Sequence, residues 1–107
     1  MGDLFDLTGK IAVVTGASSG LGADAALAYA DAGANVVLLA RRYDKLNKVK
    51  GIIEKRGKKA LSIKCDITKE DMVCAAIHEA LETFGHIDIL LNNAGVALRG
   101  GVDDLTD

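Results

Sequence analysis

Short apolar runs alternate with longer amphipathic stretches along the chain. Four runs rich in Val, Ile, Leu and Ala predict buried strands, at residues 10–15, 35–40, 60–65 and 87–92. Between them lie three stretches with the composition and spacing of helices, at residues 21–33, 43–56 and 68–85. The predicted order of elements is therefore βαβαβαβ.

Each predicted helix has an apolar face that a sheet would bury. In the first helix this face is mostly alanine: Leu21, Ala25, Ala28, Tyr29 and Ala32. In the second it is Leu46, Val49 and Ile53, and in the third it is Val73, Ile77, Ala80, Leu81 and Phe84. Gly33, Gly57 and Gly85 are expected to end the three helices, and Thr68 to serve as the N-cap of the third.

Strands joined by helical crossovers of this length lie parallel, with helices on both faces of the sheet. We predict an α/β fold: a Rossmann-like doubly wound parallel sheet, incomplete, with four strands in the order 3-2-1-4 and three helices. The first two helices would cover one face and the third helix the other. The fourth strand would be an open apolar edge, so we expect a longer protein or a homo-oligomer to cover it.

Length and composition indicate one globular domain. The chain has 107 residues, half of them hydrophobic and 26% charged. No segment approaches the roughly 18 consecutive apolar residues of a membrane span, and the first residues do not resemble a signal peptide. We therefore expect a cytoplasmic protein without a membrane partner.

Charge is unevenly distributed behind the net value of −2. Nine basic residues against two acidic ones lie between positions 41 and 59. A basic stripe can bind nucleic acid, but a solvated helix face explains it equally simply. We favour the solvated face and no nucleic-acid partner, except for Arg41 and Arg42.

The cysteines and histidines do not form a recognisable motif. Cys65, Cys74, His78 and His86 lack the spacing of a zinc site or of a redox CxxC pair. We interpret all four as structural or surface residues and predict no metal. A redox or metal role is the alternative, and it has no motif behind it.

The segment "TGASSGLG", residues 15–22, joins the first predicted strand to the first helix. A helix N-terminus offers unpaired N–H groups and a favourable dipole to an anion. Gly16 would make the sharp turn, Gly20 would let a diphosphate approach, and Gly22 would let the helix pack closely. The hydroxyls of Ser18 and Ser19 would face ribose or phosphate oxygens. A flexible loop is the simpler alternative.

Three further stretches complete a pattern: "ARR" (40–42), "CDIT" (65–68) and "NNAG" (92–95). In their order and spacing, these four segments make the chain resemble the N-terminal part of a short-chain dehydrogenase/reductase, over essentially its whole length. The resemblance implies that Ser18, Gly20, Leu21 and Gly22 line the cofactor's diphosphate and ribose. It also implies that Asp66 accepts from the adenine amino group and that Ile67 packs on the ring.

The last motif has two interpretations. The resemblance implies that the backbone around Asn93, Ala94 and Gly95 runs beside the nicotinamide ribose, while Asn92 steadies the fourth strand. In isolation, "NNAG" is equally typical of a turn that ends a strand.

The end of the second strand points to the cofactor. Enzymes that prefer NAD place an acidic residue there to bind the ribose 2′-hydroxyl, but this chain has Ala40. The guanidinium of Arg41 follows directly and suits a phosphate. We therefore expect NADP(H) rather than NAD, with Arg42 either assisting or solvated.

The family's catalytic Tyr-x-x-x-Lys pair is not found in these residues. Tyr29 is followed four positions later by Gly33, and Tyr43 by Asn47. We thus expect residues 1–107 to be the NADP-binding half of a Rossmann domain whose catalytic half is absent, and the polypeptide alone to be inactive. The parent protein would be an NADP(H)-dependent oxidoreductase that transfers a hydride to or from a small-molecule carbonyl or alcohol. A stand-alone nucleotide-binding or regulatory module is the alternative.

Overall fold

A computed structural model describes residues 6–18 and 20–93 and contains the seven predicted elements in the predicted order. They are β1 (Ile11–Thr15), α1 (Gly20–Asp31), β2 (Asn35–Ala40), α2 (Tyr43–Lys55), β3 (Ala60–Lys64), α3 (Glu70–Phe84) and β4 (Ile89–Asn92). The strands form one parallel sheet in the order β3-β2-β1-β4. The predicted fold class is therefore confirmed.

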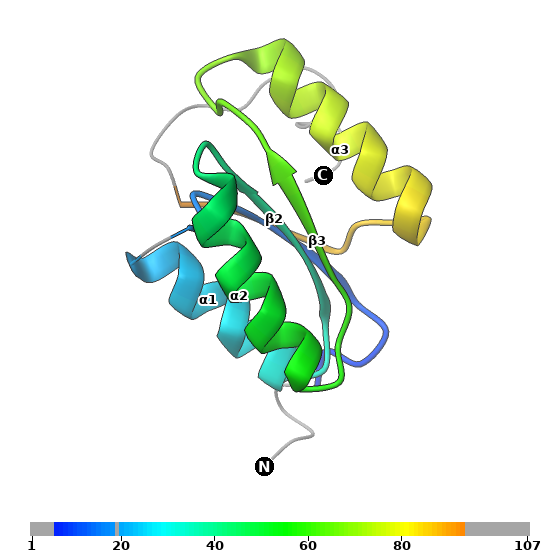
Figure 1. Ribbon diagram of the computed structural model, residues 1–107. Helices are drawn as coiled ribbons and strands as arrows, with labels where there is room; N and C mark the ends of the chain where they lie inside the picture. The colour runs from blue at the N-terminus through cyan, green and yellow to red at the C-terminus, as the bar shows by residue number, and fades with distance from the viewer. Residues whose placement is uncertain (1–5, 19, 94–107) are drawn as a thin grey trace.

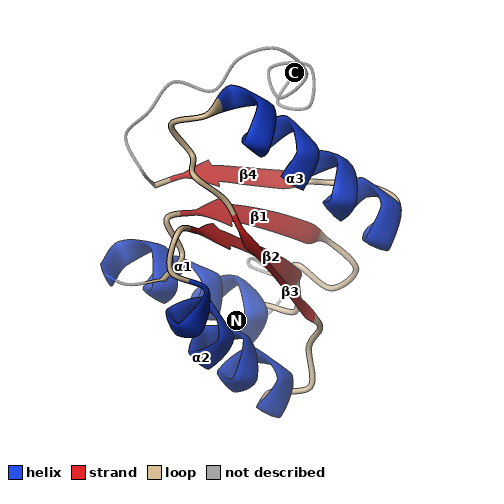
Figure 2. Ribbon diagram, turned by 45° about the horizontal axis from the view of Figure 1, so that its top comes forward, coloured by secondary structure: helices blue, strands red, loops and turns tan. Residues whose placement is uncertain are grey.

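The sheet separates two helical layers. Figure 1 shows α1 and α2 side by side along the sheet, and Figure 2 shows α3 on the opposite side from them. Alternate residues of the central strand β2 serve the two layers: Val36 and Leu38 pack with residues of α1 and α2, whereas Val37 and Leu39 pack with residues of α3. All four are fully buried, which explains why β2 is apolar from its second residue to its end.

The fourth strand begins later than predicted, at Ile89 rather than at residue 87. The side chain of Asp88 explains the difference. Its Oδ2 accepts the backbone N–H of Ile11 at 2.8 Å, while its own N–H donates to the carbonyl of Ile11 at 2.9 Å. The same carboxylate lies 3.0 Å from Nε2 of His86. The residue-by-residue pairing of β4 with β1 starts at the next residue, where Ile89 pairs with Ala12.

The predicted buried face of α1 is wrong. The helix buries Gly22, Ala26 and Ala30, whereas Leu21 is 76% exposed. Because almost every residue of this helix is small or apolar, the sequence does not define a single apolar stripe. Gly22 sets the rotation of the helix, because a side chain at this position would overlap the carbonyl of Gly16 in the turn after β1. For α2 and α3 the predicted faces are confirmed, with Leu46, Val49 and Ile53 buried in α2 and with Val73, Ile77 and Ala80 in α3, where Leu81 and Phe84 are partly buried.

The ends of α3 confirm one capping prediction and correct another. Gly85 is the C-cap in the left-handed conformation, and its N–H donates to the carbonyl of Leu81 at 2.7 Å. At the other end, Lys69 rather than Thr68 is the N-cap, without a side-chain capping bond. The hydroxyl of Thr68 instead donates to Asp66 Oδ1 at 2.6 Å. Thr68 therefore bonds to an aspartate two residues earlier instead of capping the helix.

Within residues 6–18 and 20–93, β4 pairs with β1 alone and forms an edge of the sheet. Its residues Ile89, Leu90 and Leu91 are half-buried. What covers this edge stays a prediction. No helix among the described residues has the length and hydrophobicity needed to cross a bilayer.

Two positions on α2 test the packing of the layer that α1 and α2 form. Leu46 is fully buried and Ile52 is 40% exposed. We expect Leu46→Ala to lower the free energy of unfolding by about 2–5 kcal/mol, because it leaves a cavity. Ile52→Ala, on the same helix, should cost less than about 1 kcal/mol. Urea denaturation of the two variants measures the difference, and equal losses would contradict the described orientation of α2.

Candidate functional site

An open pocket of about 990 Å³ lies where β1, β2 and β3 end. The carboxyl ends of parallel strands are the usual ligand-binding edge of such a sheet. Residues from the last positions of these strands, from the turns after them and from the first turns of α2 and α3 line the pocket: Gly16, Ser18, Ala40, Arg41, Arg42, Lys45, Lys64, Asp66, Ile67 and Met72.

The turn after β1 is held in a fixed, compact shape. Gly16 and Gly20 have positive φ angles of 66° and 60°, a conformation that side chains disfavour. A Cβ on Gly22 would overlap the carbonyl oxygen of Gly16 and lie 2.9 Å from Nδ2 of Asn93. Ala17 is buried, and its N–H donates to the carbonyl of Leu39 at 3.2 Å. The glycines thus bring the start of α1 against the ends of β1 and β4.

A buried hydroxyl joins the ends of β1 and β4. Thr15 is fully buried; its Oγ1 donates to Oδ1 of Asn92 at 3.1 Å and accepts the N–H of Asn93 at 3.0 Å. The last residues of β4 therefore lie beside the glycine turn. The sequence marks Thr15 only as the end of a strand, because its contacts join it to Asn92 and Asn93, which are far away in the chain.

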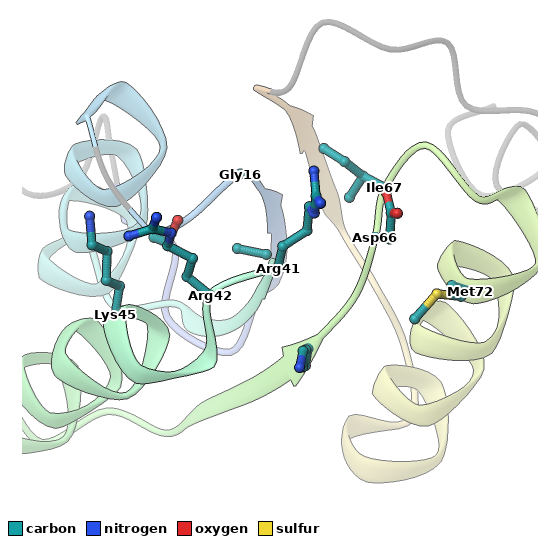
Figure 3. A pocket seen from close by; sticks show the side chains of 10 residues that line it. Gly16, Arg41, Arg42, Lys45, Asp66, Ile67 and Met72 are labelled. Carbon is teal, nitrogen blue, oxygen red and sulfur yellow. The ribbon is translucent and has the colours of Figure 1, made fainter.

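Positive charge dominates one wall of the pocket. Arg41, Arg42 and Lys45 come from the β2–α2 segment, and Lys64 ends β3. Figure 3 shows Arg41 extending into the space between the α2 side and the Asp66–Ile67 segment, with Arg42 and Lys45 on the α2 side. Ala40, at the end of β2, contributes no charge. The arrangement suits a ligand with several negative charges.

Asp66 is the carboxylate of the lining. Hydrogen bonds from the hydroxyl and the N–H of Thr68, at 2.6 and 3.0 Å, hold the pKa of Asp66 below its ordinary value, and the charges of Arg41 and Lys69 add to this effect. The group is therefore an anion and a pure hydrogen-bond acceptor at neutral pH. Ile67 and Met72 provide the apolar surface next to it. A ring with an exocyclic amino group matches this combination.

The pocket contains six of the predicted site residues: Gly16, Ser18, Arg41, Arg42, Asp66 and Ile67. Gly20, Leu21, Gly22 and Asn93 lie outside its lining, and Ser19, Ala94 and Gly95 lie outside the described residues. Sequence reasoning missed Lys45, Lys64 and Met72. Lys45 belongs to the basic segment that was interpreted as a solvated face. Lys64 reaches the pocket because β3 pairs with β2, and Met72 because α3 begins beside the pocket. Neither relation is visible in a local sequence motif.

Cys65 and His86 do not line the pocket. Cys65 packs in the core beneath α3, and its burial, together with the charge of Asp66, raises the pKa of its thiol. Such a thiol stays protonated and unreactive at neutral pH. His86 contacts Asp88 and the carbonyl of Gly9 before the start of β1, at the opposite end of the sheet from the pocket.

The residues present fit a dinucleotide. An anionic acceptor with apolar neighbours suits an adenine, the cationic wall suits phosphate groups, and the glycine turn at the start of α1 suits a diphosphate. Each of these features lies on the same edge of the sheet.

Comparison with known proteins gives consistent matches. A family model for short chain dehydrogenases matches residues 10–107. Versicolorin reductase 1 of Dothistroma septosporum is 41% identical over 105 residues, which cover 97% of this chain and 40% of that protein. This chain spans between 35% and 40% of the length of the curated relatives that it matches.

Two solved structures share the fold closely. A metagenomic short-chain oxidoreductase in complex with NADP has a TM-score of 0.80 and 44% identity, over 90% of this chain and 43% of that one. A 7α-hydroxysteroid dehydrogenase complexed with NADH has a TM-score of 0.85 and 40% identity, over 90% of this chain and 38% of that one. The fold is thus compatible with either nicotinamide cofactor.

Gly22 and Gly51 form a matched pair of helical glycines. A Cβ at position 51 meets nothing within 4 Å, whereas one at position 22 overlaps the Gly16 carbonyl. We expect Gly51→Ala to raise the free energy of unfolding by up to about 1 kcal/mol through helix propensity. Gly22→Ala should lower it by about 1–3 kcal/mol through overpacking. Thermal or urea unfolding checks the opposite signs, and stabilisation by both changes would contradict the described close contact.

The carboxyl of Asp66 gives a test by titration. Thr68→Val removes the hydroxyl that donates to it, so we expect the pKa of Asp66 to rise towards its ordinary value. A lowered pKa contributes stability above the unfolded-state pKa, and this is lost as pH falls through the folded-state value. The variant should therefore lose less stability on acidification.

Carbon-13 NMR of the carboxyl groups measures this shift. Asp6, whose pKa Thr8 lowers in an equivalent turn, is the internal control and should not move. An unchanged Asp66 would contradict the role of Thr68.

Proposed function

This chain belongs to the short chain dehydrogenase family, and we propose that it forms the NADP(H)-binding half of an oxidoreductase. The parent enzyme would transfer a hydride between the nicotinamide and a carbonyl or alcohol of a small-molecule substrate. The chain spans about two fifths of the length of its curated relatives, in keeping with such a half. Versicolorin reductase 1 and the hydroxysteroid dehydrogenase bear the names of very different substrates, so only the reaction class is proposed.

The observation that carries the cofactor assignment is the pairing of Ala40 with Arg41 in the pocket. A carboxylate at position 40 would bind a ribose 2′-hydroxyl and repel a 2′-phosphate. Ala40 removes that repulsion, and the Arg41 guanidinium offers two parallel donors to phosphate oxygens. Arg42 and Lys45 add positive charge from the same side of the pocket. The combination favours the phosphorylated cofactor over NAD.

The other residues are assigned by their chemistry and by the family pattern. Asp66 would accept from the adenine amino group, with Ile67 against the ring. Gly16, Ser18, Ser19, Gly20, Leu21 and Gly22 would surround the diphosphate and its ribose, and Asn93, Ala94 and Gly95 would run beside the nicotinamide ribose. The bound cofactor would supply or accept the hydride.

Thr15 would act as a positioning residue in this site. Its hydroxyl fixes the N–H of Asn93 beside the glycine turn, and so sets the spacing between the segment that would hold the diphosphate and the segment that would lie beside the nicotinamide ribose. It touches neither the substrate nor the cofactor in this proposal.

A homo-oligomer or the remainder of the parent protein would cover the edge of β4. Leu90 and Leu91 face opposite layers, one packing with α3 and the other with the α1–α2 layer, and both are half-buried. An edge strand with apolar residues on both faces favours extension of the sheet.

Removal of the Arg41 side chain tests the assignment. A charge-assisted hydrogen bond contributes about 1.5–3 kcal/mol, so Arg41→Ala should weaken NADPH binding about ten- to a hundredfold and leave NADH nearly unchanged. Fluorescence titration of both cofactors measures this, and Lys55→Ala, on the exposed side of α2, is the charge-matched control. Equal losses for NADPH and NADH would overturn the assignment.

A further inference from the structure

Lys64 occupies a position next to the cofactor-selecting end of β2 that no sequence motif marks. We propose that the Lys64 ammonium is a second binding group for the 2′-phosphate of NADP(H) and shares the discrimination against NAD(H) with Arg41. This inference rests on the proposed function, because it assigns a further specificity-determining residue to the same pocket.

The register of the sheet places Lys64 beside Ala40. The two are paired Cα partners on neighbouring parallel strands, and the N–H of Cys65 donates to the carbonyl of Ala40 at 2.9 Å. This bond fixes the backbone just after Lys64 to the last residue of β2. The distance between the two positions is therefore set by the strand ladder and not by a flexible loop.

Side-chain alternation places the Lys64 side chain on the layer of α1 and α2. Two residues earlier in β3, Ser62 pairs with Leu38, which packs with α1 and α2, and Ala60 packs in the same layer. Leu61 and Ile63 pack on the opposite face, with α3. Because successive side chains of a strand alternate, Lys64 shares the face of Ala60 and Ser62.

Lys64 and the arginines line the same pocket from neighbouring strand ends. Position 40 carries only a methyl group, so nothing in the side chain of Ala40 fills the room between Lys64 and the β2–α2 turn. Lys64 is exposed and lines the pocket together with Arg41. Among the residues that the structure describes, no carboxylate lies within ion-pair distance of its ammonium.

The chemistry of the two cations is complementary. A phosphate monoester carries close to two negative charges at neutral pH and three acceptor oxygens. The Arg41 fork binds two of these oxygens in one plane, whereas a lysine ammonium is a compact point charge that can approach from another direction. The Lys64 ammonium is therefore suited to neutralise the part of the phosphate charge that the single guanidinium of Arg41 does not. A ribose 2′-hydroxyl, being neutral, would gain little from it.

The test uses two fragments of the cofactor that differ only in the 2′-phosphate: adenosine 2′,5′-bisphosphate and adenosine 5′-monophosphate. Calorimetric titration compares the wild-type protein with Lys64→Met and Lys64→Gln, which remove the charge, and with Lys64→Arg, which keeps it. Lys59→Met is the control, because Lys59 is an exposed lysine just before the start of β3 and outside the pocket. Thermal unfolding of each variant verifies the fold.

We expect Lys64→Met and Lys64→Gln to weaken binding of the bisphosphate roughly three- to tenfold, between the effect of a solvent-screened ion pair and that of a charge-assisted hydrogen bond. Binding of the monophosphate should stay unchanged, as should both affinities in Lys59→Met. Lys64→Arg should retain most of the preference for the bisphosphate. In an Arg41→Ala background, a residual preference should remain and should fall further on addition of Lys64→Met.

The outcomes separate this inference from the proposed function. Equal losses for the two nucleotides, or no loss for either, would overturn the role of Lys64 while a wild-type preference for the bisphosphate still supports NADP(H). A wild-type protein without that preference would overturn the cofactor assignment itself, and the inference with it. Loss of the preference for the bisphosphate in Lys64→Arg would show that positive charge at this position is not what selects the phosphate.

Discussion

The approach of α1 to the end of β1 is the contact on which the site depends. The Gly16 carbonyl occupies the space that any side chain at position 22 would need. Because position 22 is a glycine, the helix can begin at Gly20, directly after the turn, and point its N-terminus at the edge where the strands end. The rotation of α1 follows from the same contact, because Ala26 and Ala30 lie one and two turns beyond Gly22 and share its buried face.

Much of the fold was predictable because the spacing of apolar residues along the chain matches the positions that the fold buries. The central strands are apolar without interruption, and α2 and α3 each carry one clear apolar stripe. For α1, alanines on all sides made several rotations equally compatible with the sequence, and a tertiary contact decided between them. At Asp66 and Asp88, carboxylates bond to a hydroxyl and to a backbone N–H just before the start of an element. Such competition between side chain and backbone has no periodic signature.

The candidate site also contains residues that the sequence predicts and residues that it does not. Residues in contiguous motifs, such as Gly16, Arg41 and Asp66, were predictable because local spacing alone places them at strand ends. Lys64 and Met72 enter the pocket through the pairing of β3 with β2 and the crossing of α3 to the other face. These relations join residues that are distant in the sequence. A sequence pattern read along one segment cannot report them.

The cationic wall also links ligand binding to the stability of the fold. Four like charges gathered at the ends of two adjacent strands repel one another, which raises the free energy of the folded state relative to an unfolded chain in which they are dispersed. An anion that binds there both relieves this repulsion and adds its own binding free energy, by mass action. The melting temperature of the protein should therefore depend on the phosphate and salt in the buffer. Comparisons of stability between variants of this edge are meaningful only at one fixed anion concentration.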